Sequence, residues 1–219
     1  TFKESLQKGI RSMEIKRFGF GLDSIDKWLD HVRQREATEA AALAHKPLAG
    51  SRAAEAPADT TEQKASKYPI PLKTLRDKLS RPCQGRLYYI RYAFKMGWSV
   101  EQVHELTLID PWFLENLKEL VDFETRILEV APPASLHKDD KAMPDEKLRQ
   151  VLTQAKEWGY SDVQLARAWQ WHRDDVRRLR ERIGLKPVYK LVDTCAAEFE
   201  AVTPYYYSSC EVPAVKVVR

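Results

Sequence analysis

The residues that could carry chemistry are histidines, cysteines and neighbouring carboxylates, and their spacing matches no recognised catalytic motif. The five histidines are scattered at positions 31, 45, 104, 137 and 172. They form no HExxH pair, and the eight glycines form no GxGxxG or GxxxxGK loop of the kind that holds phosphate. Paired carboxylates such as Asp174-Asp175 and Asp139-Asp140 are more typical of a helix start or a solvated linker. The residues therefore predict no catalytic, cofactor or metal site in this chain.

The cysteines indicate packed thiols and not a nucleophile or a disulfide framework. There are three, Cys83, Cys195 and Cys210, and they are odd in number and far apart. A catalytic thiol needs a nearby base or cation, whereas Cys195 lies between Thr194 and two alanines. We expect reduced thiols in a cytoplasmic protein.

A basic segment over residues 173–190 is the strongest charge feature, in a chain whose net charge is only +4. One interpretation is nucleic-acid binding; the other is contact with carboxylates of a protein partner. Acidic residues interleave with the arginines, and the corresponding helix near 111–130 is acidic, which disfavours nucleic acid. Arg177 and Arg178 are therefore candidates for a protein interface. A stand-alone helical adaptor or nucleic-acid module built on 173–190 is the alternative.

Aromatic residues supply the other interface candidates. Tyr205, Tyr206 and Tyr207 are consecutive, so their rings cannot all face one way. A buried aromatic ring removes about 150–250 Å² from water, and a segment that leaves such area exposed is suited to lie against something else. Trp112 adjoins Phe113, and because neighbouring helical residues point in different directions, we expect one of them to leave the core.

The elements that position these residues are expected to be helices. Apolar periodicity and capping signals predict helices over 72–79, 86–96, 100–108, 111–130, 144–158, 162–169 and 174–183. Two groups of these helices echo each other at an offset of 62 residues. Each has a glycine that ends a helix, Gly97 or Gly159, followed by a Ser-x-x-Gln capping box. Duplication and convergence both explain this echo.

Two polar stretches and one irregular stretch complete the chain. Residues 36–68 have few apolar anchors and predict a mobile loop, although their alanines could extend a helix that begins near Ser24. Residues 131–143 predict a linker. Residues 188–208 show neither helical nor strand periodicity and predict an irregular extended segment. The expected fold is all-α: two small helical bundles joined by a linker, with an extended irregular C-terminal segment. No apolar run is long enough to cross a membrane.

Three stretches resemble the carbamoyl-phosphate synthase large chain. VDTCAAEFEAVTPYYYS (192–208) resembles the block that leads into the second synthetase half of that family. TFKESLQKGIRSME (1–14) looks like the closing helix of the first half, and RLYYIRYAFKMGWSVEQVHELTLIDPWFLENLKELV (86–121) looks like the first central helical group. The absence of an initiator methionine fits a piece of a longer protein. The tail at 211–219 departs from the family, which continues into a glycine-rich nucleotide loop.

The resemblance implies a role for each part of the chain. The expected divisions are the end of the first synthetase half (1–22), an insertion or flexible linker (23–69), a first helical group (70–130), a linker (131–143), a second helical group (144–187) and a lead-in to the second half (188–219). The chain would be the oligomerisation, or connection, domain. It would be non-catalytic itself and would hold the two ATP-dependent halves of the large chain together.

The resemblance also implies the parent enzyme. That enzyme would be a glutamine-hydrolysing ligase of arginine and pyrimidine biosynthesis that makes carbamoyl phosphate from bicarbonate, glutamine-derived ammonia and two ATP. It would use ATP, Mg²⁺ or Mn²⁺, and K⁺, all bound outside these residues. The expected partners are the flanking halves, other large chains and a glutaminase small chain, with no nucleic acid and no membrane.

Overall fold

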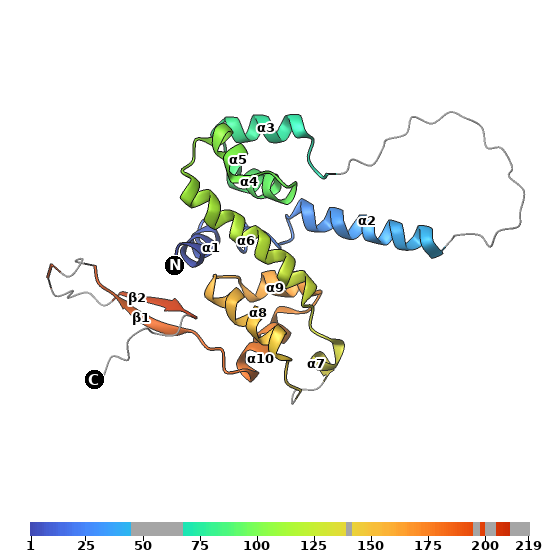
Figure 1. Cartoon of the computed structure of the whole chain (residues 1–219). Helices are drawn as coiled ribbons and strands as arrows, with labels where there is room; N and C mark the ends of the chain where they lie inside the picture. The colour runs from blue at the N-terminus through green and yellow to red at the C-terminus, as the bar shows by residue number, and fades with distance from the viewer. Residues whose placement is uncertain (45–67, 139–141, 195–197, 200–204, 211–219) are drawn as a thin grey trace, which may run out of the picture. The chain divides into compact units, whose positions relative to one another are not determined.

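A computed structural model describes residues 1–44, 68–138, 142–194, 198–199 and 205–210. The expected all-α fold is confirmed. The helices are α1 (Phe2–Ser12), α2 (Lys27–Ala44), α3 (Leu72–Ser80), α4 (Arg86–Lys95), α5 (Val100–Thr107), α6 (Pro111–Glu129), α7 (Ala134–Lys138), α8 (Glu146–Glu157), α9 (Asp162–Trp169) and α10 (Arg173–Arg182), and the strands are β1 (Val188–Val192) and β2 (Tyr205–Ser209) (Figure 1).

The chain forms two compact units, and the boundary falls inside the expected first helical group. One unit comprises 25–109 and the other comprises 1–24 together with 110–219. Helix α6, which we expected to belong with α4 and α5, is part of the second of these units, where it packs against α1, α8 and α9. The physical reason is its apolar face, where Leu117, Leu120 and Phe123 are buried among residues of its own unit.

In the 25–109 unit, α3 packs against α4 and α5. Helix α2 is fastened to α4 by a fully buried ion pair, because Arg91 donates to both oxygens of Asp26 at 2.9 and 2.7 Å. Asp26 also accepts from the backbone N–H of Trp28 and so caps α2. The helix continues to Ala44, so the alanine-rich extension is confirmed over 36–44, and residues 45–67 lie outside the described part of the chain.

In the other unit, α6 is covered by α1 on one part of its surface and by α8 and α9 on another (Figure 1). Phe123 packs against Trp158 and Tyr160, with ring centroids 4.9 and 5.9 Å apart. The buried Tyr160 hydroxyl donates to the carbonyl of Leu120, and the Trp169 indole donates to that of Ile127. These bonds satisfy the polar ends of aromatic rings inside the core.

The two helical groups share their capping geometry residue by residue. Gly97 and Gly159 both have positive φ, near +87° and +84°. Ser99 and Ser161 both form complete capping boxes, as the sequence predicted. The echo extends beyond the predicted positions: Leu108 and Gln170 end the next helices in the left-handed region, and Asp110 and His172 cap the third helices.

Two elements differ from expectation. The segment 188–208 is not wholly irregular: β1 and β2 pair antiparallel, with Lys190 opposite Tyr207 and Leu191 opposite Tyr206. Aromatic and β-branched cross-strand neighbours stabilise such a ribbon without a simple alternation of apolar and polar residues. The linker 131–143 contains the short helix α7.

Candidate interface site

The N-terminal helix α1 holds the C-terminal strand β2. Glu4 is buried, pairs with Lys8 one turn later at 2.9 Å, and accepts a hydrogen bond from the Ser209 hydroxyl at 3.1 Å. The Lys8 ammonium donates to the carbonyl of Ser208 and lies 3.8 Å from the centre of the Tyr207 ring. We call this set of contacts the clasp: Glu4 and Lys8 on α1 with Tyr207, Ser208 and Ser209 on β2.

A buried amide pair fixes the chain that follows α1. Gln7 accepts from the backbone N–H of Phe20 at 2.8 Å, and Gln164 of α9 donates to the carbonyl of Gly21 at 2.7 Å and to the Gln7 amide oxygen at 3.4 Å. Gly19 passes so close that a Cβ there would lie 2.2 Å from Gln7 Oε1. Helix α1 is therefore positioned by α9 as well as by the hairpin.

Gly159 allows α1 to approach the turn between α8 and α9. A Cβ at this residue would lie 2.9 Å from the Glu4 Cα, which is backbone and cannot move aside cheaply. Arg11 fixes the same approach, because its guanidinium donates to the Gly159 carbonyl at 2.8 Å. A residue with positive φ and no Cβ is required here, and glycine supplies both.

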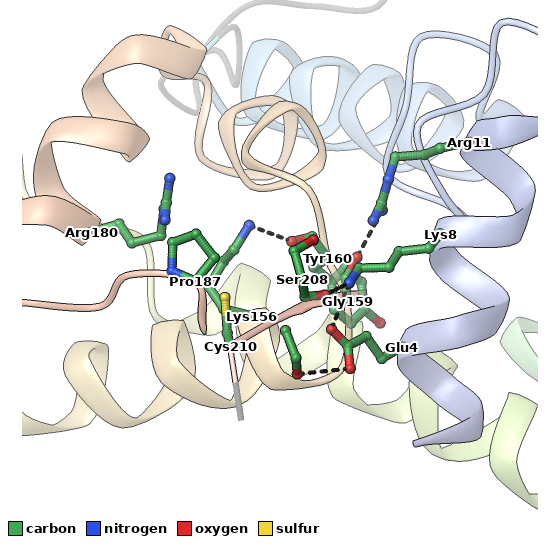
Figure 2. Close-up of a pocket in the computed structure, with 11 residues that line it drawn as sticks. Glu4, Lys8, Arg11, Lys156, Gly159, Tyr160, Arg180, Pro187, Ser208 and Cys210 are labelled. Carbon is green, nitrogen blue, oxygen red and sulfur yellow. Dashed lines mark hydrogen bonds and ion pairs between the residues drawn. The ribbon is translucent and has the colours of Figure 1, made fainter. Parts of the chain in front are cut away.

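A pocket of about 200 Å³ lies beside the clasp. Figure 2 shows Lys8 and Arg11 reaching into it from α1 on one side, and Lys156 of α8 and Arg180 of α10 on the other, with Ser208 between them. Lys156 donates to the Tyr160 carbonyl and to Asp162, both at 2.8 Å. Arg180 donates to the Leu185 carbonyl at 3.2 Å and to Asp162 at 3.3 Å.

The pocket is electropositive and partly withdrawn from water. Burial lowers the pKa of Lys156, and the charge of Asp162 opposes that shift. Burial likewise lowers the pKa of Arg11. Burial raises the pKa of the Cys210 thiol, although Lys156 and Arg180 act in the opposite direction. Cations crowded in a poorly solvated space favour a negative neighbour.

The hairpin exposes its other face. Residues that oppose each other in the register share a face, so Tyr189, Leu191 and Tyr206 lie on the side away from Ser209 and Tyr207. All three are exposed, Tyr206 by 67%. Tyr205 is also exposed, whereas Tyr207 is half-buried under Lys8. Tyr205 and Tyr206 are therefore exposed as predicted, whereas Tyr207 is not.

A second aromatic surface lies where α1 and α6 begin. The rings of Phe2, Trp112 and Phe113 contact one another, with centroids 4.9–5.4 Å apart. Trp112 is 53% exposed and Phe113 43% exposed, so both leave the core where one was expected. We call these three residues the aromatic patch.

Comparison with known proteins identifies the family. Residues 46–184 match the family model described as the carbamoyl-phosphate synthetase large chain, oligomerisation domain. The chain belongs to this oligomerisation-domain family. Carbamoyl phosphate synthase large chains from Archaeoglobus fulgidus and Rhodopirellula baltica are 39% and 37% identical over 96% and 98% of this chain. The large chain, N-terminal section, of Aquifex aeolicus is 35% identical over 97% of it. The chain spans only 15%, 16% and 28% of those relatives' lengths.

In this oligomerisation domain the arginines of α10 form ion pairs and hydrogen bonds with other residues of the same chain. Arg177 pairs with Glu181 at 2.9 Å, and this bond raises the pKa of the arginine and lowers that of the glutamate. Arg178 pairs with Asp175, three residues earlier on the same face of the helix. Because carboxylates of the same helix form ion pairs with both arginines, the nucleic-acid alternative is not favoured. The assignment of Arg177 and Arg178 to a protein interface stays a prediction.

Cys83 and Cys210 are free thiols, and Cys195 lies outside the described residues. Among the described residues, no group of three or more histidine, cysteine or acidic side chains is arranged to hold a metal. The described helices include none with the length and apolar character needed to cross a bilayer.

Sequence reasoning did not find the clasp or the pocket of this oligomerisation domain. Glu4 and Lys8 read as an ordinary pair one helical turn apart, and their partners on β2 are about 200 positions away. One signal was available: an acidic residue on the apolar side of α1, next to Gln7, marks a helix face that needs polar partners.

Proposed function

We propose that this oligomerisation domain is a non-catalytic connector that holds the two synthetase halves of a carbamoyl-phosphate synthase large chain together. The clasp is the observation that carries this proposal. It joins Glu4 to Ser209 across 205 positions of sequence, so the two segments that would lead from one half and into the other are bound side by side. The exposed outer face of the hairpin, with Tyr189, Leu191 and Tyr206, would pack against the second half.

The proposed parent reaction follows from the family. The whole enzyme would make carbamoyl phosphate from bicarbonate, glutamine-derived ammonia and two ATP, with a glutaminase small chain as partner and in the cytoplasm. Its ATP, Mg²⁺ or Mn²⁺, and K⁺ would be bound by the flanking halves. This domain would hold those halves in position and would contribute no reacting group.

Self-association of large chains would use the aromatic patch. Trp112 and Phe113 are exposed and contact the half-buried ring of Phe2, and tryptophan is among the side chains enriched in residues that dominate binding energy. The printed family description, an oligomerisation domain, supports a second copy as the occupant.

Sedimentation over a range of concentrations tests this surface. We expect the chain to associate reversibly and Trp112→Ala to weaken association by about tenfold or more, equivalent to roughly 1.4 kcal/mol or more. Leu72→Ala, which removes an equally exposed apolar side chain in the other unit, is the control and should leave association unchanged. A chain that stays monomeric at every concentration, or an unaffected Trp112→Ala variant, would contradict the assignment.

The connector role has its own test. The chain alone should hydrolyse no ATP, with or without bicarbonate, above the rate of a buffer control. A reproducible bicarbonate-dependent ATPase activity of this chain would end the proposal of a non-catalytic connector.

A further inference from the structure

The pocket beside the clasp carries more positive charge than its surroundings neutralise. Four cations face it or line it: Lys8, Arg11, Lys156 and Arg180. Among the described residues, two carboxylates form ion pairs with these cations: Glu4 pairs with Lys8, and Asp162 pairs with Lys156 and Arg180. Four positive charges against these two carboxylates leave an excess of two; Glu181 also interacts electrostatically with Arg180, but it pairs with Arg177 and does not line the pocket. An excess charge in a partly buried space is costly unless an ion of the opposite sign joins it.

The same side chains retain hydrogen-bond donors. An ammonium group has three N–H donors, and Lys8 and Lys156 each direct two of them to partners in the described part of the chain. The buried Nε–H of Arg180 has no hydrogen-bond partner among the described residues. Donors therefore remain on both sides of the pocket, from α1 and from α8 and α10 (Figure 2).

The size of the pocket limits the ligand. Its volume of about 200 Å³ lies below the roughly 300–1,000 Å³ of pockets that enclose drug-sized ligands. A nucleotide is too large, whereas a compact ion fits. A tetrahedral dianion with several acceptor oxygens matches both the excess of two charges and the donors on opposite walls.

We propose that this pocket binds a phosphate group, as free phosphate or as the phosphate of a small monoester, held by Lys8, Lys156 and Arg180. The bound group would bridge α1, α8 and α10 next to Ser208 of the hairpin. It would thereby tighten the clasp, because Lys8 belongs to both. The site shares Lys8 with the clasp, but phosphate binding can be measured whether or not the chain connects two synthetase halves, and it does not involve the aromatic patch.

Calorimetric titration of the chain tests the site. The probes are inorganic phosphate, glycerol 3-phosphate and acetate, each in chloride buffer at one ionic strength. We expect saturable binding of at least one of the two phosphates, and acetate at least tenfold weaker than that phosphate. The tighter of the two phosphates tells whether the pocket takes the free ion or a monoester. Equal affinity for acetate, or no heat from either phosphate, would overturn the proposal.

Amino-acid substitutions test which residues bind the phosphate. Arg180→Gln and Lys8→Gln should each weaken phosphate binding by about tenfold or more, whereas Arg173→Gln, on the exposed side of the same helix α10, should not change it. Backbone NMR shifts of Gly159, Tyr160 and Ser208 on phosphate addition give a readout that does not depend on any variant folding. Shifts confined to the exposed arginines of α10 would place the ion elsewhere and refute this site.

Discussion

At the scale of single residues, the interior of the 25–109 unit depends on one charged pair. Arg91 and Asp26 are both buried, and each satisfies the other through two hydrogen bonds. Two buried charges are expensive to desolvate, so the pair contributes less to net stability than its geometry suggests. Removing one partner has a larger effect, since it leaves the other charge buried without its ion-pair partner.

We therefore expect Arg91→Met to lower the free energy of unfolding of this unit by about 3–5 kcal/mol. The double variant Arg91→Met/Asp26→Asn should recover part of that loss, because asparagine keeps the cap on Trp28 without a buried charge. Urea unfolding followed by circular dichroism measures both. Lys118→Met, which breaks an exposed pair with Asp122, is the control and should cost under about 1 kcal/mol. An Arg91→Met loss no larger than the control's would show that the pair contributes little.

The pairing of Arg91 with Asp26 could not be predicted from the sequence. The two residues are 65 positions apart, and an arginine between Ile90 and Tyr92 reads as one of many helical surface cations. Local chemistry was predictable where both partners lie within one turn. Ser99 with Gln102 and Ser161 with Gln164 were predicted as capping boxes, and both are confirmed.

At the scale of elements, the repeated helical groups give a matched pair of glycines. Gly97 and Gly159 have nearly the same positive φ and close their helices in the same way. Only Gly159 lies against another element, since a Cβ at Gly97 would meet nothing within 4 Å. Any extra cost at Gly159 thus reports the close approach of α1.

Alanine at either glycine should cost about 1–2 kcal/mol for the left-handed backbone alone. We expect Gly97→Ala to show only that loss, and Gly159→Ala to lose more, because its methyl group would collide with the backbone of Glu4. Thermal unfolding gives the two free energies. The hydrogen-exchange rates of the α1 amides provide a local measurement. They should rise in Gly159→Ala and stay unchanged in Gly97→Ala. Equal losses with α1 still protected would mean that α1 does not depend on this contact.

Seven helices, α3 to α6 and α8 to α10, were predictable to within a residue or two, because glycine ends and serine caps mark many of their limits, whereas α7 and the second half of α2 were not. The pairing of β1 with β2 was not predictable. Consecutive tyrosines at 205–207 hide the alternation of a strand, and the two strands are separated by more residues than a tight hairpin turn would use. The division into units was not predictable either, since the apolar face of α6 does not specify which helices cover it.

At the scale of the whole molecule, the residues at 192–208 were enough to predict the family from the sequence. The contact between the N-terminal helix α1 and the C-terminal strand β2 was found only in the structure. The clasp is made by side chains about 200 positions apart, and no local pattern encodes such a distance. Its centre is Glu4, which is buried and accepts from both Lys8 and Ser209.

Glu4→Gln tests whether the clasp holds the hairpin to the rest of its unit. The substitution keeps the shape and removes the charge, and a hydrogen bond to a charged group contributes about 1.5–3 kcal/mol. We expect faster hydrogen exchange in β1, β2 and α1, and unchanged exchange in α3, α4 and α5. Glu181→Gln, which removes an exposed pair on α10, is the control and should leave the hairpin protected. Because the clasp and the proposed phosphate site share Lys8, added phosphate should restore part of the protection lost in Glu4→Gln. A hairpin that exchanges no faster in this variant would show that strand pairing alone, without α1, holds β2 in place.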